Sequence, residues 1–256
     1  MANLENCILG APLGKTHLFS VGQAGYLIKS SSGQLLGIDL YLSECVERME
    51  GHIGFKRLLP KLLQPFDLKL DVVIATHAHF DHFDIDSIPQ ILSNHNTKLL
   101  AAADCKELIE KLRLNSSQVT YVVPGLSVKV GDFNIHFIDC DHGDATPDAV
   151  GVIVEVDGKR ILETGDTCLH LDWVDEYKKY GPIDVMIAPI NGAYGNLNEQ
   201  ECAELSGQVK PEVTIPCHYG MFASHGGNPG RFMDFMRQQY PDNAFLLMAQ
   251  GESLTV

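Results

Sequence analysis

The stretch Thr76-His77-Ala78-His79-Phe80-Asp81-His82 directly follows the apolar run Asp71-Val72-Val73-Ile74-Ala75. An apolar, β-branched run of this length is typical of a buried strand. The polar stretch therefore falls in a loop at the carboxyl end of that strand, where α/β proteins place functional groups. Neutral imidazole and carboxylate are ligands for zinc, manganese and iron, so this spacing indicates a metal site. A solvated polar loop is the alternative, but it does not explain the whole pattern.

Composition limits the class of protein. The chain has 256 residues, is 45% hydrophobic and has a net charge of −14. Its length and apolar content favour one large α/β layered domain over residues 1–256. The acidic balance and the lack of a basic patch argue against nucleic acid as the natural partner.

Targeting signals and cysteine usage indicate a cytoplasmic protein. The N-terminal residues 1–10 lack a basic start and a long apolar core, so we expect no signal sequence. No run approaches the roughly 18–20 apolar residues that span a bilayer, and no membrane contact is expected. The seven cysteines form no C-x-x-C pair, which fits reduced thiols.

Apolar runs and turn residues alternate along the rest of the chain, which predicts a layered α/β build. Asp157-Gly158 between two apolar runs predicts a type I′ hairpin, and we expect Ser87 and Asn198 to cap helices. The expected strands are 17–21, 25–29, 35–39, 71–75, 98–102, 119–123, 126–130, 133–138, 149–156, 159–163, 184–188, 213–215, 245–248 and 253–256. The expected helices are 43–50, 104–112, 171–180, 198–209 and 229–240, with a further helix beginning at 87–92.

Three more potential ligands follow expected strands: His142, Asp166 and His218. Taken singly, His142 would more often be a polar turn residue, and Gly165-Asp166-Thr167 a turn with a helix cap. Their recurrence at strand ends, in a chain that already carries the His-rich loop, favours one shared metal centre. Asp39 also ends a strand, and it either supports the metal loop from beneath or is a simple turn carboxylate.

These motifs, in this order, resemble those of metallo-β-lactamase superfamily hydrolases. The resemblance implies an α/β fold of the four-layer αβ/βα sandwich type, with the metals at one edge. Within the superfamily the chain is most similar to the L-ascorbate-6-phosphate lactonase (UlaG-like) group, although members of that group are substantially longer. The stretches that carry this similarity are Asp39-Leu40-Tyr41-Leu42-Ser43 with Val46-Glu47-Arg48, Pro189-Ile190-Asn191-Gly192 with Gly195-Asn196-Leu197-Asn198, and Ile215-Pro216-Cys217-His218-Tyr219-Gly220-Met221-Phe222 followed by Asn228-Pro229.

The resemblance also implies which residues hold the metals. It assigns His77, His79 and His142 to one divalent ion, Asp81, His82 and His218 to a second, and Asp166 to a bridging position. Both ions would be zinc or manganese, with iron as a further option. Asp81 and Asp166 are the expected catalytic carboxylates, which orient the attacking water and accept its proton. Cys140, Cys168 and Cys217 lie near these residues, and we expect them to be buried fillers and not ligands.

The implied activity is metal-dependent hydrolysis of a lactone or ester of a small, sugar-like molecule, with or without a phosphate. Two alternatives stay open: a phosphodiesterase or phosphoesterase acting on a small substrate or, less favoured, on RNA, and a non-catalytic metal-binding protein. Homo-oligomer formation is also open. Candidate substrate contacts, for which ordinary loop roles are the alternative, are Asn191, Tyr194, Tyr219, His225 and Arg231.

Overall fold

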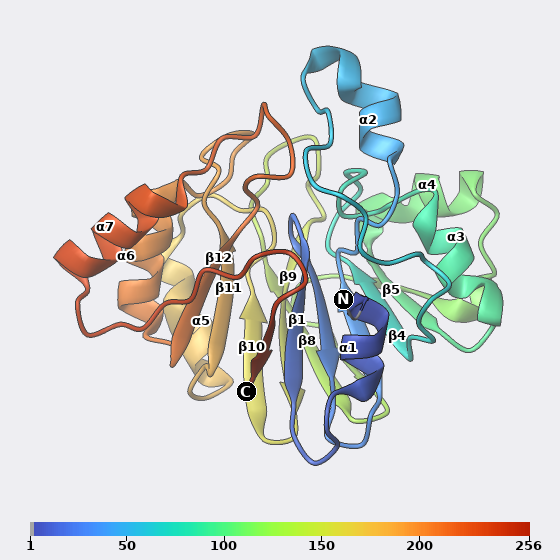
Figure 1. Cartoon of the computed structure of the whole chain (residues 1–256), viewed down its shortest axis with the longest axis horizontal. Helices are drawn as coiled ribbons and strands as arrows, with labels where there is room; N and C mark the ends of the chain where they lie inside the picture. The colour runs from blue at the N-terminus through green and yellow to red at the C-terminus, as the bar shows by residue number, and fades with distance from the viewer. Residues whose placement is uncertain (1–2) are drawn as a thin grey trace.

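The computed structural model describes residues 3–256, in which two β-sheets pack against each other (Figure 1). The first sheet of these residues has the strand order β13 (Ser253–Thr255), β1 (His17–Gly22), β2 (Gly25–Lys29), β3 (Leu35–Ile38), β4 (Val72–Ala75), β5 (Lys98–Ala102) and β6 (Val119–Val122). The second has the order β12 (Val213–Cys217), β11 (Val185–Pro189), β10 (Lys159–Glu163), β9 (Val150–Val156), β8 (Phe133–Asp139) and β7 (Ser127–Val130).

Each sheet is mixed in strand direction. Strands β3 to β6 are parallel to one another, as are β10 to β12. The remaining neighbours are antiparallel, including the hairpin of β9 and β10, whose turn residues Asp157 and Gly158 both have positive φ. Parallel strands bring their carboxyl ends to the same edge of a sheet, which matters for the site described below.

Helices cover the outer faces of the two sheets (Figure 1). The first sheet is covered by α3 (Ser87–Ile91) and α4 (Lys106–Lys111), and the second by α5 (Val174–Lys179), α6 (Glu199–Val209) and α7 (Pro229–Gln239). The chain also forms α1 (Leu4–Gly10) and α2 (Cys45–Glu50), and in Figure 1 α2 stands apart above the sheets. This arrangement confirms the expected α/β four-layer sandwich. Among the described residues, no helix is both long and apolar enough to cross a membrane.

The main core lies between the two sheets. Leu18 and Ile28 of the first sheet share one buried cluster with Phe133, Ile135 and Val152 of the second. Burying each such side chain stabilises the fold by roughly 1.5–3 kcal/mol. A second cluster joins the outer face of the second sheet to α5, α6 and α7. The two sheets are thus held at a fixed distance, which fixes the loops at their common edge.

Two expectations about local structure are wrong. Residues 245–248 form no strand, because this segment leaves β12 after one bridge at Phe245 in order to reach β1 of the other sheet. Ser87 does not cap a helix but is its first residue. The N-cap position is Asp86, whose side chain makes no capping hydrogen bond, and Oδ1 of Asp84 instead accepts hydrogen bonds from the backbone N–H groups of Asp86 and Ser87.

Asn198 caps α6 as expected. Its Oδ1 accepts from the N–H groups of Gln200 and Glu201, and Glu201 in turn accepts from the Asn198 N–H. Replacing Asn198 with alanine should therefore cost about 1 kcal/mol of unfolding free energy. Urea denaturation would measure this loss. Asn198→Asp, which keeps an acceptor, should retain wild-type stability, and an equal loss in both variants would contradict the capping role.

Candidate metal centre

All seven proposed ligands lie just beyond the carboxyl ends of strands. His77, His79, Asp81 and His82 follow β4, and the others follow β8, β10 and β12. The first sheet therefore supplies one part of the centre and the second sheet the rest. Most of these side chains are nearly inaccessible to solvent, whereas His79 is exposed.

His77, His79 and His142 form the first of three overlapping groups of potential ligands in the described residues. Nδ1 of His79 lies 3.0 Å from Nε2 of His77 and 3.1 Å from Nε2 of His142. Three imidazole nitrogens at these distances can converge on one cation. This is the group that the resemblance assigns to one ion.

The other two groups share His82. One contains Asp81, His82 and His218, and the other contains His77, His82 and Asp166. Nε2 of His82 and Nε2 of His218 are 3.3 Å apart. Oδ2 of Asp166 lies 3.0 Å from Nε2 of His218 and 3.8 Å from Nε2 of His142. The Asp166 carboxylate thus lies between the two sets of histidines.

The chemistry of these atoms fits a bound cation. Nδ1 of His82 is 2.7 Å from Oδ2 of Asp39 and donates to it, so Nε2 is the ring nitrogen that can bind a metal ion once its own proton is displaced. Nε2 lies 3.4 Å from Oδ2 of Asp166. Oδ1 of Asp166 is buried without a hydrogen-bond partner among the described residues. Buried carboxylates gathered in this way need a compensating positive charge, which a metal ion would supply.

Burial and neighbouring charges set the protonation states. Burial and the nearby His82 keep the pKa of His77 well below its usual value, and burial lowers the pKa of His142 to about 4. Burial by itself would raise the pKa of Asp166, but His218 and His82 outweigh it and hold this pKa well below its usual range. His77 and His142 are therefore neutral and Asp166 is ionised, the forms that bind metal ions. Burial by itself would lower the pKa values of His82 and His218, but Asp166 outweighs it and raises the pKa of His82 well above its usual value and that of His218 to about 9, so a metal ion would displace the extra protons of these two rings.

Asp39 holds the His-rich loop, residues 76–82, in place and is therefore not a simple turn carboxylate. Besides contacting His82, it accepts hydrogen bonds from the N–H and the Oγ1 hydroxyl of Thr76, at 2.8 and 2.6 Å. Its carboxylate is fully buried. Asp39 therefore fixes both the start of the loop and the orientation of one of its histidines.

The sequence analysis missed two amide side chains in the centre. Nε2 of Gln23 lies 2.8 Å from Oδ2 of Asp81 and 2.9 Å from Nδ1 of His225. Nδ2 of Asn196 donates to Oδ2 of Asp166 at 2.8 Å. Gln23 lies in a glycine-flanked stretch typical of an ordinary turn, so no signal in the sequence distinguishes it. Asn196 lies in a stretch that carries the resemblance to the lactonase group, but that resemblance assigned it no role.

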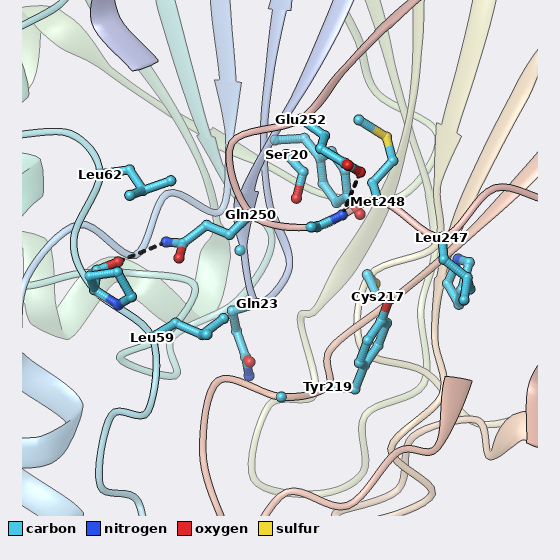
Figure 2. A pocket seen from close by; sticks show the side chains of 16 residues that line it. Ser20, Gln23, Leu59, Leu62, Cys217, Tyr219, Leu247, Met248, Gln250 and Glu252 are labelled. Carbon is cyan, nitrogen blue, oxygen red and sulfur yellow. Dashed lines mark hydrogen bonds between the residues drawn. The ribbon is translucent and has the colours of Figure 1, made fainter. Parts of the chain in front are cut away.

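The candidate substrate contacts separate into two groups. Tyr194 and His225 line a pocket of about 260 Å³ that opens on the metal-ligand side chains, and Asn191 accepts a hydrogen bond from Asn196 close to Asp166. Tyr219 lines a different, larger cavity of about 560 Å³, shown in Figure 2. Arg231 is largely exposed, and its nearest acidic partner is Glu199 at 3.9 Å. The structure thus brings neither Tyr219 nor Arg231 to the pocket over the centre.

The three nearby cysteines differ in their surroundings. Cys217 is buried and belongs to none of the potential ligand groups, and the Cys140 thiol donates to the backbone oxygen of Asp166 at 3.0 Å. Cys168 instead forms a separate, partly exposed cluster with Asp141 and His170. The sequence patterns did not predict this cluster, because Cys168 was expected to be a buried filler.

Replacing Cys217 with alanine should leave the metal content unchanged. Burial raises the pKa of its thiol well above the usual value, so it stays protonated and is a poor ligand. Plasma mass spectrometry of the purified protein would measure the metal per chain. Loss of an ion in this variant, but not in Cys202→Ala, would show that the Cys217 sulfur is a ligand.

Comparison with known proteins agrees with this architecture. Residues 17–218 match the model of the beta-lactamase superfamily domain. A UPF0173 metal-dependent hydrolase of Anaeromyxobacter sp. (strain K) is 26% identical over 242 residues, which cover 86% of this chain and 80% of the relative. A UPF0173 metal-dependent hydrolase of Pyrococcus abyssi is 29% identical over 174 residues, covering 66% and 76%.

Solved structures show the same fold. Igni18, a metallo hydrolase from Ignicoccus hospitalis, superposes with a TM-score of 0.73 at 21% identity, covering 94% of this chain and 98% of its own. The metallo-beta-lactamase fold protein YhfI from Bacillus subtilis superposes with a TM-score of 0.70 at 17% identity, covering 94% and 100%. The family match extends over most of the chain and includes every proposed ligand, so the chain belongs to the beta-lactamase superfamily domain family.

Proposed function

We propose that this chain is a metal-dependent hydrolase that uses water to open a small ester or lactone. The observation that carries the proposal is the buried Asp166 carboxylate between two sets of histidines, beside a pocket large enough for a small molecule. Similarity to proteins described as metal-dependent hydrolases supports the same reaction class.

The residues for metal binding follow from the groups described above. His77, His79 and His142 would hold one ion, and Asp81, His82 and His218 the other, with Asp166 shared. Nitrogen and carboxylate ligands without a thiolate suit zinc, manganese or iron. When bound, such ions lower the pKa of a water molecule and polarise a carbonyl group.

The side chains around the centre would orient the reacting groups. Asp81 and Asp166 position the attacking water and accept its proton. Nε2 of Gln23 is a hydrogen-bond donor, so Nδ1 of His225 accepts and its Nε2 carries the proton of the neutral ring. His225 lines the pocket, where its N–H can donate to the carbonyl or leaving-group oxygen of the substrate.

Two other functions are less well supported. Phosphoester hydrolysis could use the same centre, but the net charge of −14 and the lack of lysine or arginine in the pocket lining weigh against RNA or a phosphorylated substrate. A non-catalytic metal-binding role leaves unexplained why all seven ligand positions are filled around an accessible pocket.

Proton release from a panel of neutral and phosphorylated lactones, in weak buffer, tests the proposal. Turnover with added zinc or manganese that a chelator abolishes would support it. A panel of small phosphoesters, assayed in parallel, tests the alternative. If metal-loaded protein hydrolysed phosphoesters and no lactone or ester, the proposal would fail.

A further inference from the structure

The pocket over the metal-ligand side chains is lined mainly by carbon atoms. His79, Asp81 and His218 form its floor. Its walls consist of four apolar or aromatic side chains, one histidine and one carboxylate: Ile53, Phe55, Phe80, Tyr194, His225 and Glu50. A substrate that reaches the centre must therefore lie against mainly carbon surfaces.

Three loops contribute rings that contact one another. The ring of Phe55, just beyond α2 and its following turn, lies 5.1 Å from that of His225 and 5.7 Å from that of Tyr194. The rings of Tyr194 and His225 are also 5.7 Å apart. Behind them, Phe222 packs edge-on against Phe55 at 5.8 Å. Phe222 thus packs behind the three rings of Phe55, Tyr194 and His225, and these three rings line the pocket.

Two wall residues are exposed at a cost to the protein. Tyr194 is 56% exposed and Ile53 is 61% exposed. Tyr194 also has φ of +58°, a left-handed conformation that is unfavourable for a residue with a Cβ. A ligand that covers both side chains would recover part of that cost by burying apolar surface.

The charges around the pocket oppose a phosphate on the substrate. Glu50 and Asp81 both line it, while lysine and arginine do not. Two arginines close in sequence to the pocket residues are engaged elsewhere: Arg48 pairs with Asp86, and the Arg57 guanidinium donates to the backbone oxygens of Ser43 and Leu59. A phosphate placed away from the metal-ligand side chains would therefore face carbon atoms and a carboxylate.

We infer that the substrate is an uncharged ester or lactone bearing an aromatic or similarly flat apolar group, which packs against Phe55 and Tyr194. This inference rests on the proposed function and names its substrate class. Water adds to the carbonyl carbon, the bond from this carbon to the leaving oxygen breaks, and the products are a carboxylate, an alcohol and one released proton. The His225 N–H donates to an oxygen at this carbon.

Three matched lactones test the inference on metal-loaded protein: α-benzyl-γ-butyrolactone, its α-methyl analogue and the benzyl compound with a phosphate on its ring. All three contain the same reacting bond. We expect kcat/KM for the benzyl compound to exceed that for the methyl compound by about tenfold, as a well-packed aromatic contact allows. The phosphorylated compound should be the poorer of the two benzyl substrates. Equal rates for benzyl and methyl, or a preference for the phosphate, would overturn the inference.

Variants locate the effect in the pocket. Tyr194→Ala should lower kcat/KM for the benzyl lactone by about tenfold and change that for the methyl lactone by less than about twofold. Phe66→Ala is the matched control, because Phe66 is an exposed aromatic residue outside the pocket lining. Glu50→Lys should raise activity on the phosphorylated compound. No change in the Tyr194 variant would contradict the packing role.

A binding measurement separates this inference from the proposed function. Calorimetry with 2-benzylcyclopentanone and 2-methylcyclopentanone, which hydrolysis cannot open, reports on the pocket without turnover. Tighter binding of the benzyl ketone, lost in Tyr194→Ala, would support the substrate class even if no lactone were hydrolysed, and only the reaction type would then fail. Equal binding of both ketones would overturn the substrate class by itself.

Discussion

Replacing Asp166 with alanine is expected to remove metal and to lower lactone hydrolysis by at least about 100-fold. Residues that merely orient metal ligands are worth about 10- to 100-fold in affinity or activity, and a shared ligand should be worth no less. Oδ2 of Asp166 lies 3.0 Å from Nε2 of His218 and 3.4 Å from Nε2 of His82, closer to each of these two nitrogens than the Asp81 carboxylate is. Without the Asp166 carboxylate, the His82 and His218 imidazoles would lose a negatively charged neighbour, and a cation would bind there less tightly.

Metal analysis and proton-release assays on the same preparation would measure both effects. Asp172→Ala is the matched control, because the Asp172 side chain is exposed and lies outside the centre. Full activity and full metal content in the Asp166 variant would refute the bridging assignment. Loss of activity with full metal content would instead indicate that Asp166 accepts the proton of the attacking water and is not needed to bind metal.

Replacing Gln23 with leucine is expected to reduce kcat by about 10- to 100-fold, the range for residues that orient catalytic groups. Leucine keeps the volume of the side chain and removes the donor to Nδ1 of His225 at 2.9 Å. The His225 ring could then rotate by about 180° about its Cβ–Cγ bond, or carry its proton on Nδ1 in place of Nε2. Gln23 also contacts Asp81, so metal content must be measured alongside activity.

A double-mutant cycle tests whether Gln23 acts through His225. If Gln23 positions this ring, the double variant Gln23→Leu with His225→Ala should be no slower than His225→Ala alone. Additive losses would show that the two side chains act independently. Gln250→Leu is the control, because Gln250 lines the neighbouring cavity (Figure 2). Its side-chain amide donates to the backbone oxygens of Val21 and Pro60.

The sequence was sufficient to predict the fold and the convergence of the seven ligand candidates. The four-layer fold and the grouping of the ligands were implied by the resemblance to the superfamily. The residues themselves add one regularity: the candidates come soon after apolar runs, and strand ends in a layered α/β fold meet at a common edge. His142 and Asp166 are weak signals singly, yet the sheets bring them to the His-rich loop. Pattern and topology agree at these positions.

The parts that could not be predicted depend on side-chain direction and long-range contact. Gln23 lies in a tight turn with φ of +57°, and only the folded structure directs its amide at the histidines. Phe55 reaches the pocket because α2 stands away from the sheets. Tyr219 directly follows the ligand candidate His218 but lines the larger cavity, because adjacent residues can face opposite sides of one backbone. Arg231 is exposed to solvent and does not line the pocket over the centre.

The division of the ligand candidates between the two sheets has a consequence for the order of assembly. His77 to His82 are synthesised early, whereas Asp166 and His218 come from the last strands of the second sheet. Neither ion could be fully bound until the second sheet has docked on the first. Metal binding is therefore expected to be a late step of folding that stabilises the contact between the two sheets. It should add about 2.7 kcal/mol to the free energy of unfolding when the free metal is at 100 times its dissociation constant.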